Sequence, residues 1–510
     1  MPRDKFVTAE AAAAMVGDGA TVGLIGGGSG LMEASCLFAA IERRFLDTAH
    51  PRELRLVHAL GIGDKAERGL NRFAHEGMVR AVIGGHWVWS PRMQQLAAEE
   101  KIEAYVLPGG VIGQLYREIG AGRPGLFTHV GLGTFVDPRF GGGRMNARAG
   151  ETLADVMEID GREVLRYRPF PVDVALLRGS YADADGNISL RQECANVDAF
   201  DLALAAHNSA GKVIVQVRTA VDRGTIPARD VHIPGAWVDA VVVDPEQSMT
   251  YEIGYDPTLS GELRGPVPPR PPEPFTERVA VARRASLELR EDAVVNYGFG
   301  MPDLVARIVA DRGDADRYYQ TIEHGVYGGD LLTGALFGFG RNATAYINGP
   351  SQFDFYAGGG LDLAFLGFGE FDAQGNVNVS MLGGVTVGPG GFMDIAANAG
   401  TVVFCGTFEA KGLRVRAGEG RLVVDRPGAV PKVVAQVDQV TFSGPQAVAR
   451  GQRVLFVTER AVFRLTAEGI VLDEVAPGID VQTQVLDRMG FAPVLPPGGP
   501  ALMPTDCFQE

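Results

Sequence analysis

Apolar runs that lead into glycines and then into helical periodicity occur twice along the chain. The first run covers residues 20–25 and is followed by a glycine-rich stretch and a helix predicted over 31–44. The second run covers 293–297 and leads through a second glycine-containing stretch into a helix predicted over 303–310. Strand, glycine turn and helix in this order are typical of a parallel sheet with crossover helices. The pattern therefore predicts α/β units that bind ligands at the carboxyl ends of their strands.

Further short apolar runs extend this pattern. Residues 81–106 alternate apolar runs with a helix predicted over 91–101. The C-terminal part, to which we assign no function, contains three apolar runs that predict strands, at 421–424, 433–437 and 454–457.

The two halves of the chain are related to each other. Residues 173–188 and 362–377 align without a gap at an offset of 189 and share seven identities in sixteen positions. The same offset places 210–213 over 399–402, and an apolar run follows each. A repeat of this length predicts two similar open, mostly parallel α/β units from an internal duplication, because solenoid repeats are much shorter.

A proline-rich segment separates these units. Seven prolines lie within residues 256–277, a density that excludes helix and sheet interior and favours an extended linker. We therefore expect an N-terminal domain over 1–255, the linker over 256–277 and a C-terminal domain over 278–510.

Composition excludes several classes of function. The 47 Lys and Arg against 62 Asp and Glu give a net charge of −15, which argues against binding to nucleic acid or to an anionic membrane. The four cysteines form no C-x-x-C pair, and no apolar run is long enough to span a membrane, so we expect a cytoplasmic protein. The 68 glycines are nearly twice the usual share, which indicates many tight turns or close approaches to a ligand.

Common catalytic motifs fail on spacing. The third glycine of a dinucleotide-binding fingerprint is replaced by Leu31 in the first loop and by Asp303 in the second. Residues 27–31 lack the last glycine of a nucleophile elbow. His75-Glu76 has Val79 where a zinc protease has its second histidine, and the sequence predicts no metal site. The glycine loops are then either plain turns or backbone donors that face an anion.

One carboxylate stands out. Glu323 follows a predicted strand and precedes three glycines within six positions, so it is expected at a strand end with little side-chain bulk around it. At the offset of 189 its counterpart in the first half is Thr134, which would leave only the second unit with an acid at this position. A turn carboxylate without catalytic role is the alternative.

These residues together resemble a family I coenzyme A (CoA) transferase. The likeness rests on Glu323 with its glycines, on the Gly-Phe-Gly-Met-Pro loop at 298–302 and on the run from Gly358 to Val379. It covers nearly the whole chain and is greatest to the single-chain acetate/propionate CoA-transferase branch. The resemblance implies that Glu323 is catalytic and that Gly298, Phe299 and Gly300 form an oxyanion loop. It also implies a CoA site, for which the candidates are Gly359, Gly360, Gly383, Gly384 and the stretch 388–392.

The resemblance further implies a ping-pong reaction. CoA would move from a short-chain acyl-CoA to a carboxylic acid such as acetate or propionate, through a glutamyl-CoA thioester on Glu323. A carboxylate at its reference pKa of about 4.3 is ionised at pH 7 and needs no general base. CoA is then a substrate, no permanently bound cofactor is expected, and a homo-oligomer is expected from the branch. An acyl-CoA hydrolase on the same scaffold and a non-catalytic small-metabolite sensor remain as alternatives.

Overall fold

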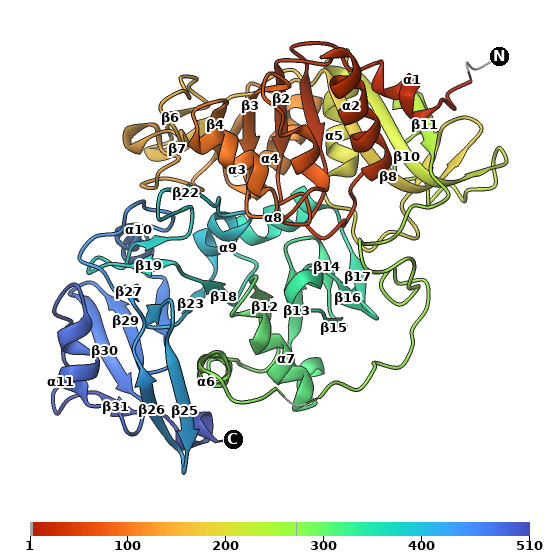
Figure 1. Cartoon of the computed structure of the whole chain (residues 1–510). Coiled ribbons are helices and arrows are strands. Elements are labelled where there is room, and N and C mark those ends of the chain that lie inside the picture. Colours follow the sequence, from red (N-terminus) through yellow and green to blue (C-terminus); the bar gives the residue numbers. More distant parts are fainter. Residues whose placement is uncertain (1–3, 272, 510) are drawn as a thin grey trace.

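A computed structural model describes residues 4–271 and 273–509 and contains two α/β units, each built around an open sheet (Figure 1). The first sheet has the order β11-β10-β8-β1-β2-β3-β4, and all neighbours in this path are parallel. Its strands are β1 (Thr21–Leu24), β2 (Leu54–His58), β3 (Val79–Gly84), β4 (Glu103–Val106), β8 (Val174–Asp183), β10 (Lys212–Val221) and β11 (Ala240–Val243). Its helices are α1 (Ala9–Ala13), α2 (Ser35–Thr48), α3 (Pro91–Ala98), α4 (Gly109–Gly120) and α5 (Ala199–Asn208).

The second sheet has the order β17-β14-β13-β12-β18-β23-β28-β29-β30-β31. The path from β13 to β28 is parallel, and antiparallel strands extend it on both sides. The parallel strands are β12 (Val294–Tyr297), β13 (Tyr319–Ile322), β18 (Leu363–Gly367), β23 (Thr401–Cys405) and β28 (Arg453–Val457). The other strands are β14 (Val326–Tyr327), β17 (Ala345–Tyr346), β29 (Ala461–Thr466), β30 (Gly469–Val475) and β31 (Ala501–Leu502). The helices are α6 (Glu277–Ser286), α7 (Asp303–Asp311), α8 (Gly349–Ala357), α9 (Phe392–Asn398), α10 (Gly444–Ala449) and α11 (Val481–Gln484).

The predicted duplication is confirmed by the strand order. The path β2-β1-β8-β10-β11 of the first sheet has the same order as β13-β12-β18-β23-β28 of the second. The offset of 189 relates β8 to β18 and β10 to β23, but it fails before β8 because the first unit carries extra elements between β2 and β8. The residue after β2 is Ala59, and the residue after β13 is Glu323. Thr134 is therefore the wrong counterpart, and Ala59 takes its place.

Most predicted element boundaries hold, and three differ, one of them because helix α3 ends at Ala98, three residues before the end predicted for it. Strands β1 and β12 and helix α7 lie where the pattern placed them, and the run 421–424 lies in β26 (Arg421–Arg426). Helix α2 begins at Ser35, four residues later than predicted, because Gly30 and Met32 adopt φ values of +88° and +56° that no α-helix allows. The run 433–437 forms no strand; it makes one isolated bridge, between Val433 and Phe371.

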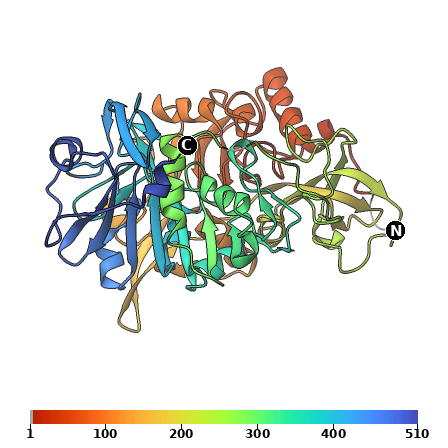
Figure 2. The ribbon, with the colours of Figure 1, turned by 90° about the horizontal axis from the view of Figure 1, so that it is seen from below.

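The proline-rich segment between β11 and α6 contains no helix or strand among its described residues, and Pro272 lies outside them. Ion pairs hold it against the second unit, at Asp256–Arg341 (3.2 Å) and Arg270–Asp330 (2.6 Å). At the other end of this unit, the C-terminal turn Thr505–Phe508 packs against α6 (Figure 2). The predicted domain boundaries stay a prediction.

The two units meet along α4. The backbone N–H of Gly110 donates to Asp394 Oδ2 on α9 (3.0 Å), and that of Gly109 donates to the carbonyl of Gly390 (2.7 Å). Trp87 N–H donates to the carbonyl of Val387 (2.8 Å) in the same way. These contacts bring the carboxyl ends of the two parallel sheets together. Among the described helices, none is both long and apolar enough to cross a bilayer.

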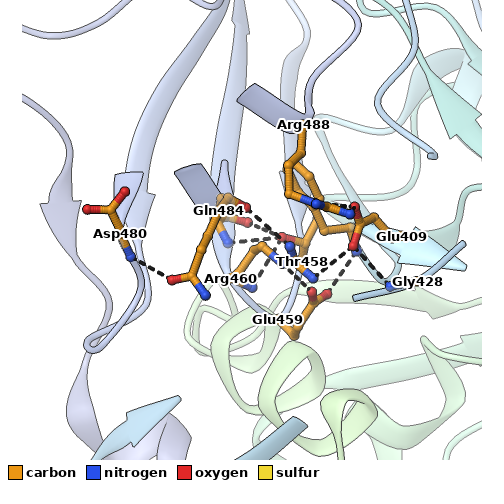
Figure 3. A network of polar contacts seen from close by, with 10 residues as sticks. Glu409, Gly428, Thr458, Glu459, Arg460, Asp480, Gln484 and Arg488 are labelled. Atoms are coloured by element: carbon orange, nitrogen blue, oxygen red, sulfur yellow. Dashed lines mark hydrogen bonds and ion pairs between the residues drawn. The ribbon is translucent and has the colours of Figure 1, made fainter. Parts of the chain in front are cut away.

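A buried ionic network joins the antiparallel side of the second sheet to its surrounding loops (Figure 3). The Arg460 side chain is 1% exposed, and it pairs with Glu459 (2.8 Å) and Glu409 (3.3 Å). Arg460 also donates to the carbonyl of Gln484 (3.1 Å), and Arg488 pairs with Glu409 from the surface side. The network connects three segments that are far apart in sequence and lies away from the cavity described next.

Candidate active site

A cavity of about 300 Å³ lies between the two units. Its walls follow the carboxyl ends of six parallel strands, β1, β2 and β3 from the first unit and β12, β13 and β18 from the second. This is where open α/β sheets bind their ligands. The lining is mostly apolar or glycine, and it includes Gly27, Leu60, Gly61, His86, Trp89, Gly298, Phe299, Glu323, His324, Phe337, Leu366, Gly367, Phe368, Leu382, Gly388, Pro389, Gly390, Gly391, Phe392 and Ile395.

Glu323 is the one carboxylate in this lining. It occupies the turn between β13 and β14, where Gly325 has a φ of +89° and approaches the carbonyl of Ile347 so closely that a Cβ would not fit. The turn therefore needs glycine, which explains the sequence that follows Glu323. Gly391 lies on the other side, and a Cβ built there would stand 3.4 Å from Glu323 Cγ.

The environment of Glu323 disfavours its charged form. The residue is 8% exposed, and burial raises the pKa of its carboxyl to about 7. The Asn296 amide on the neighbouring strand β12 acts in the opposite direction on this pKa. Glu323 Oε2 has no hydrogen-bond partner among the described residues. A buried, unpaired carboxylate on a cavity wall is costly for folding, and groups with pKa values perturbed in this way are concentrated at functional sites.

A layer of polar side chains lies beside this carboxylate. Asn296 Nδ2 donates to Tyr356 Oη (3.2 Å), and Tyr356 Oη is 2.8 Å from Thr321 Oγ1 on β13. Asn296 and Thr321 are paired across the two strands in the sheet register. These hydrogen bonds fix the positions of the residues that flank Glu323.

The predicted oxyanion loop reaches the cavity only in part. Gly298 and Phe299 line it, and Gly300 does not. The N–H of Gly298 donates to the carbonyl of Phe365 (2.8 Å), so Gly298 has no free donor. Phe299 is 40% exposed, and its ring lies 6.3 Å from that of Trp89 and 5.5 Å from that of Phe337. An aromatic group from each unit thus borders the entrance.

The glycines predicted to bind CoA fall into two groups. Gly383 and Gly384 form the turn after Leu382 at the cavity rim, and the space around them is open. Gly359 and Gly360 follow helix α8 and do not line the cavity. A Cβ at Gly360 would collide with the ring of Phe355, so this position needs glycine for local packing. The expected CoA contact of Gly359 and Gly360 stays a prediction.

The stretch 388–392 does line the cavity, but the contribution of the first unit was not predicted. Gly27 belongs to the first glycine loop, whereas Gly61, His86 and Trp89 come from loops whose sequence carries no catalytic signal. They reach Glu323 only through the docking of the two units. Burial lowers the pKa of His86 and of His324 to about 4, so both imidazoles are neutral at pH 7.

Comparison with known proteins identifies the class of enzyme that this fold and cavity define. The model of the family described as Coenzyme A transferase matches residues 6–244. The acetate CoA-transferase YdiF of Escherichia coli O157:H7 is 40% identical over 498 residues, which cover 97% of this chain and 93% of that protein. The chain belongs to the coenzyme A transferase family.

A further relative and a solved structure support this assignment. Caffeate CoA-transferase of Acetobacterium woodii is 42% identical over 500 residues, 96% of this chain and 95% of that protein. A crystal structure of the E. coli O157:H7 acyl-CoA transferase YdiF, a thioester complex with CoA, superposes with a TM-score of 0.94 at 38% identity and covers 100% of this chain and 97% of that one. The chain is therefore an enzyme that moves CoA between an acyl-CoA and a carboxylate, which sets aside the non-catalytic sensor.

Proposed function

We propose that Glu323 is the nucleophile of this transferase and that the acids exchanged are short carboxylic acids such as acetate and propionate. One observation carries the proposal: the cavity holds a single carboxylate, which is buried, has an unpartnered oxygen and lies at a strand end where the two units meet. The relatives named acetate CoA-transferase and caffeate CoA-transferase indicate that carboxylic acids of different size are used on this scaffold.

The reaction balances with one carboxylate side chain of the enzyme and with no cofactor. A Glu323 oxygen attacks the acyl-CoA carbonyl, and the CoA thiolate leaves to give an acyl-glutamyl anhydride. The thiolate then attacks the Glu323 carbonyl of this anhydride, which releases the first carboxylate and forms a glutamyl-CoA thioester. The acceptor carboxylate attacks the thioester, and the thiolate leaves and attacks the new acyl carbonyl. The products are a new acyl-CoA and free Glu323.

Burial changes the protonation state expected of the Glu323 nucleophile. The reference pKa predicted a carboxylate that is fully ionised at pH 7, whereas the raised pKa of about 7 leaves about half of it ionised. The anion that remains is more basic and less solvated than an exposed glutamate, and it is therefore a better nucleophile. The cost is a dependence of activity on pH near neutrality.

Each tetrahedral intermediate places a negative charge on oxygen. Phe299 and Gly391 both line the cavity, and their backbone N–H groups have no acceptor among the described residues. These two amides are the candidate donors, and the loss of one such donor typically costs about 2.7–4 kcal/mol. The apolar lining excludes water, which would otherwise hydrolyse the anhydride and the thioester.

Steady-state kinetics test this proposal. Initial rates with varied acyl-CoA and acceptor acid should give the parallel double-reciprocal lines of a ping-pong reaction. Glu323→Gln should lose transfer by at least ~10³-fold, and the control Glu76→Gln, at an exposed position, should keep it. Full transfer by Glu323→Gln would refute the role of Glu323. Loss of thioester without an acceptor acid, at the rate seen with one, would support the acyl-CoA hydrolase instead.

The proposal also covers the localisation, the oligomeric state and the cofactor content of the enzyme. We expect a cytoplasmic homo-oligomer without a permanently bound cofactor, with CoA as a substrate. Light scattering on the purified protein measures the oligomeric state, and mass spectrometry under native conditions detects a retained cofactor.

A further inference from the structure

The first unit contains a second cavity, of about 270 Å³, which the transfer reaction does not use. Residues from five regions line it: the segment from the loop after β1 to the start of α2, the segment that contains Arg68 and Arg72, strand β8, strand β10, and the segment after β11. The lining comprises Gly30, Glu33, Ser35, Arg68, Arg72, Arg178, Gln216, Asp244, Glu246, Gln247, Ser248, Thr250 and Tyr251. Its chemistry contrasts with that of the active-site cavity, because almost every lining side chain is polar.

The position of this cavity repeats that of the active site. In the first sheet the strand order reverses between β1 and β8, and in the second it reverses between β12 and β18. Such reversal points create the crevice in which open α/β sheets bind ligands. The active-site cavity borders β12 and β18 through Gly298 and Gly367, and the second cavity borders β1 and β8 through Gly30 and Arg178. Each unit thus has one cavity at its own reversal point.

The duplicated positions have diverged in a way that suits a polar ligand. At the offset of 189, Arg178 corresponds to Gly367, and Gln216 corresponds to Cys405. The floor is tightly organised: Arg178 pairs with Glu193 (2.9 Å), and Gln216 donates to Gln247 Oε1 (2.9 Å). These residues are buried and hydrogen-bonded, so the floor is preformed and polar.

The mouth of the cavity carries charges of both signs. Arg68 is exposed, and its nearest carboxylate, Asp64, is 3.9 Å away, which is a weak pair. Asp244 and Glu246 form no ion pair among the described residues; Asp244 accepts hydrogen bonds from the Gln216 amide (3.4 Å) and from the Glu246 backbone N–H (3.2 Å). A simple anion would meet these two carboxylates, and a simple cation would meet the guanidinium groups. A ligand that carries both a carboxylate and an ammonium group can pair with the guanidinium groups and with the two carboxylates at once.

We propose that this cavity binds a free amino acid or a zwitterion of similar size. The carboxylate of the ligand pairs with Arg68, next to the ion pair that Arg72 forms with Glu42, and its ammonium group pairs with Asp244 and Glu246. The polar floor formed by Gln247 and Thr250 accommodates the side chain. This site does not depend on the transferase mechanism.

The two cavities share a loop. Gly27 lines the active site, and Gly30 and Glu33 line the second cavity. Glu33 Oε1 accepts a hydrogen bond from Gly63 N–H (2.8 Å), and the Gly63 carbonyl accepts one from Ser29 N–H (3.0 Å). A ligand in the second cavity therefore contacts residues that hold the loop next to Glu323.

Isothermal titration of the intact protein with each of the twenty common L-amino acids tests the proposal. At least one should bind with a dissociation constant of ~1 mM or lower, and its des-amino acid and its des-carboxy amine should bind at least ~10-fold more weakly. Arg68→Gln and Asp244→Asn should each weaken binding by ~10-fold or more. The matched controls Arg92→Gln and Glu67→Gln, outside the cavity, should bind as the wild type does.

Measuring transferase activity distinguishes a variant that has lost only the second cavity's ligand from a variant that has failed to fold. Arg68→Gln and Asp244→Asn lie outside the catalytic cavity and should retain wild-type turnover without added amino acid. Three results would overturn the proposal: no binding by any of the twenty amino acids, binding unaffected by both substitutions, or equal binding of the des-amino acid. Because these readouts do not use Glu323, the proposal can fail while the proposed function stands.

Discussion

Gly391 lies between Glu323 and Phe353, and a side chain at position 391 would touch the first and clash with the ring of the second. A Cβ at 391 would stand 3.4 Å from Glu323 Cγ and 2.8 Å from the ring of Phe353. Phe353 is 1% exposed and has no space to move away. A side chain at 391 would therefore have to displace Phe353 or the backbone beside Glu323.

Gly391→Ala should lower kcat by ~10²-fold and leave the protein folded, because a carboxylate displaced by about an ångström loses its alignment with the thioester. The matched control is Gly150→Ala, where a Cβ would meet nothing within 4 Å. Turnover measurements and thermal unfolding on both variants check the prediction. Unchanged kcat in Gly391→Ala would show that the contact does not position Glu323.

Activity should depend on pH with one ionisation near neutrality. Glu323 is reactive as the anion and its pKa is raised to about 7, so kcat/KM for the acyl-CoA should rise with pH and level off above about pH 8. His86 and His324 have pKa values of about 4 and do not titrate in this range. A profile that is flat from pH 6 to pH 8 would contradict a buried nucleophile.

The same pKa shift predicts an effect on stability. The folded protein holds the Glu323 proton more tightly than the unfolded chain, whose glutamates titrate near 4.5. The stabilisation from this proton is complete below pH 4.5 and is lost as the pH rises through about 7. Glu323→Gln has no such loss and should be more stable than the wild type by up to ~3 kcal/mol at pH 8, with little difference at pH 4.5. Thermal unfolding at the two pH values measures this, and a variant that is less stable at pH 8 would contradict it.

Removal of Arg460 should destabilise the second unit strongly. Arg460→Met leaves Glu459 and Glu409 buried without this partner, a change that typically costs about 3–5 kcal/mol (Figure 3). Arg416→Met is the matched control, because Arg416 pairs with Asp425 on the surface and its side chain is 64% exposed. Thermal unfolding should show a large loss for the first variant and almost none for the second. Equal Tm values would mean that the network contributes nothing to stability.

The sequence contained enough information for the fold and for the central residue. The hydrophobic periodicity and the repeat at 173–188 and 362–377 predicted two parallel α/β units, because both features can be read directly from the order of residues along the chain. The glycines after Glu323 indicated a tight turn, which is a local feature, whereas the catalytic role of Glu323 was implied by the family resemblance and stays a prediction. The start of α2 was misplaced because the positive φ of Met32 leaves no trace in the apolar pattern.

The rest of the site depends on contacts between distant segments. The role of Trp89 and His86 arises only when the units dock, and the local sequence of the first unit does not encode that arrangement. Gly360 looked like Gly383 in sequence, although one is packed against Phe355 and the other lies in open space. The pKa of Glu323 could not be read from the sequence either, because it is set by burial.

Mass spectrometry of the enzyme after incubation with an acyl-CoA, without an acceptor acid, measures directly whether Glu323 becomes covalently modified. We expect CoA to become attached to the peptide that contains Glu323, and added acetate or propionate to remove it at a rate no slower than turnover. Rapid transfer with no adduct on Glu323, or with a covalent adduct on another residue, would show that Glu323 is not the nucleophile.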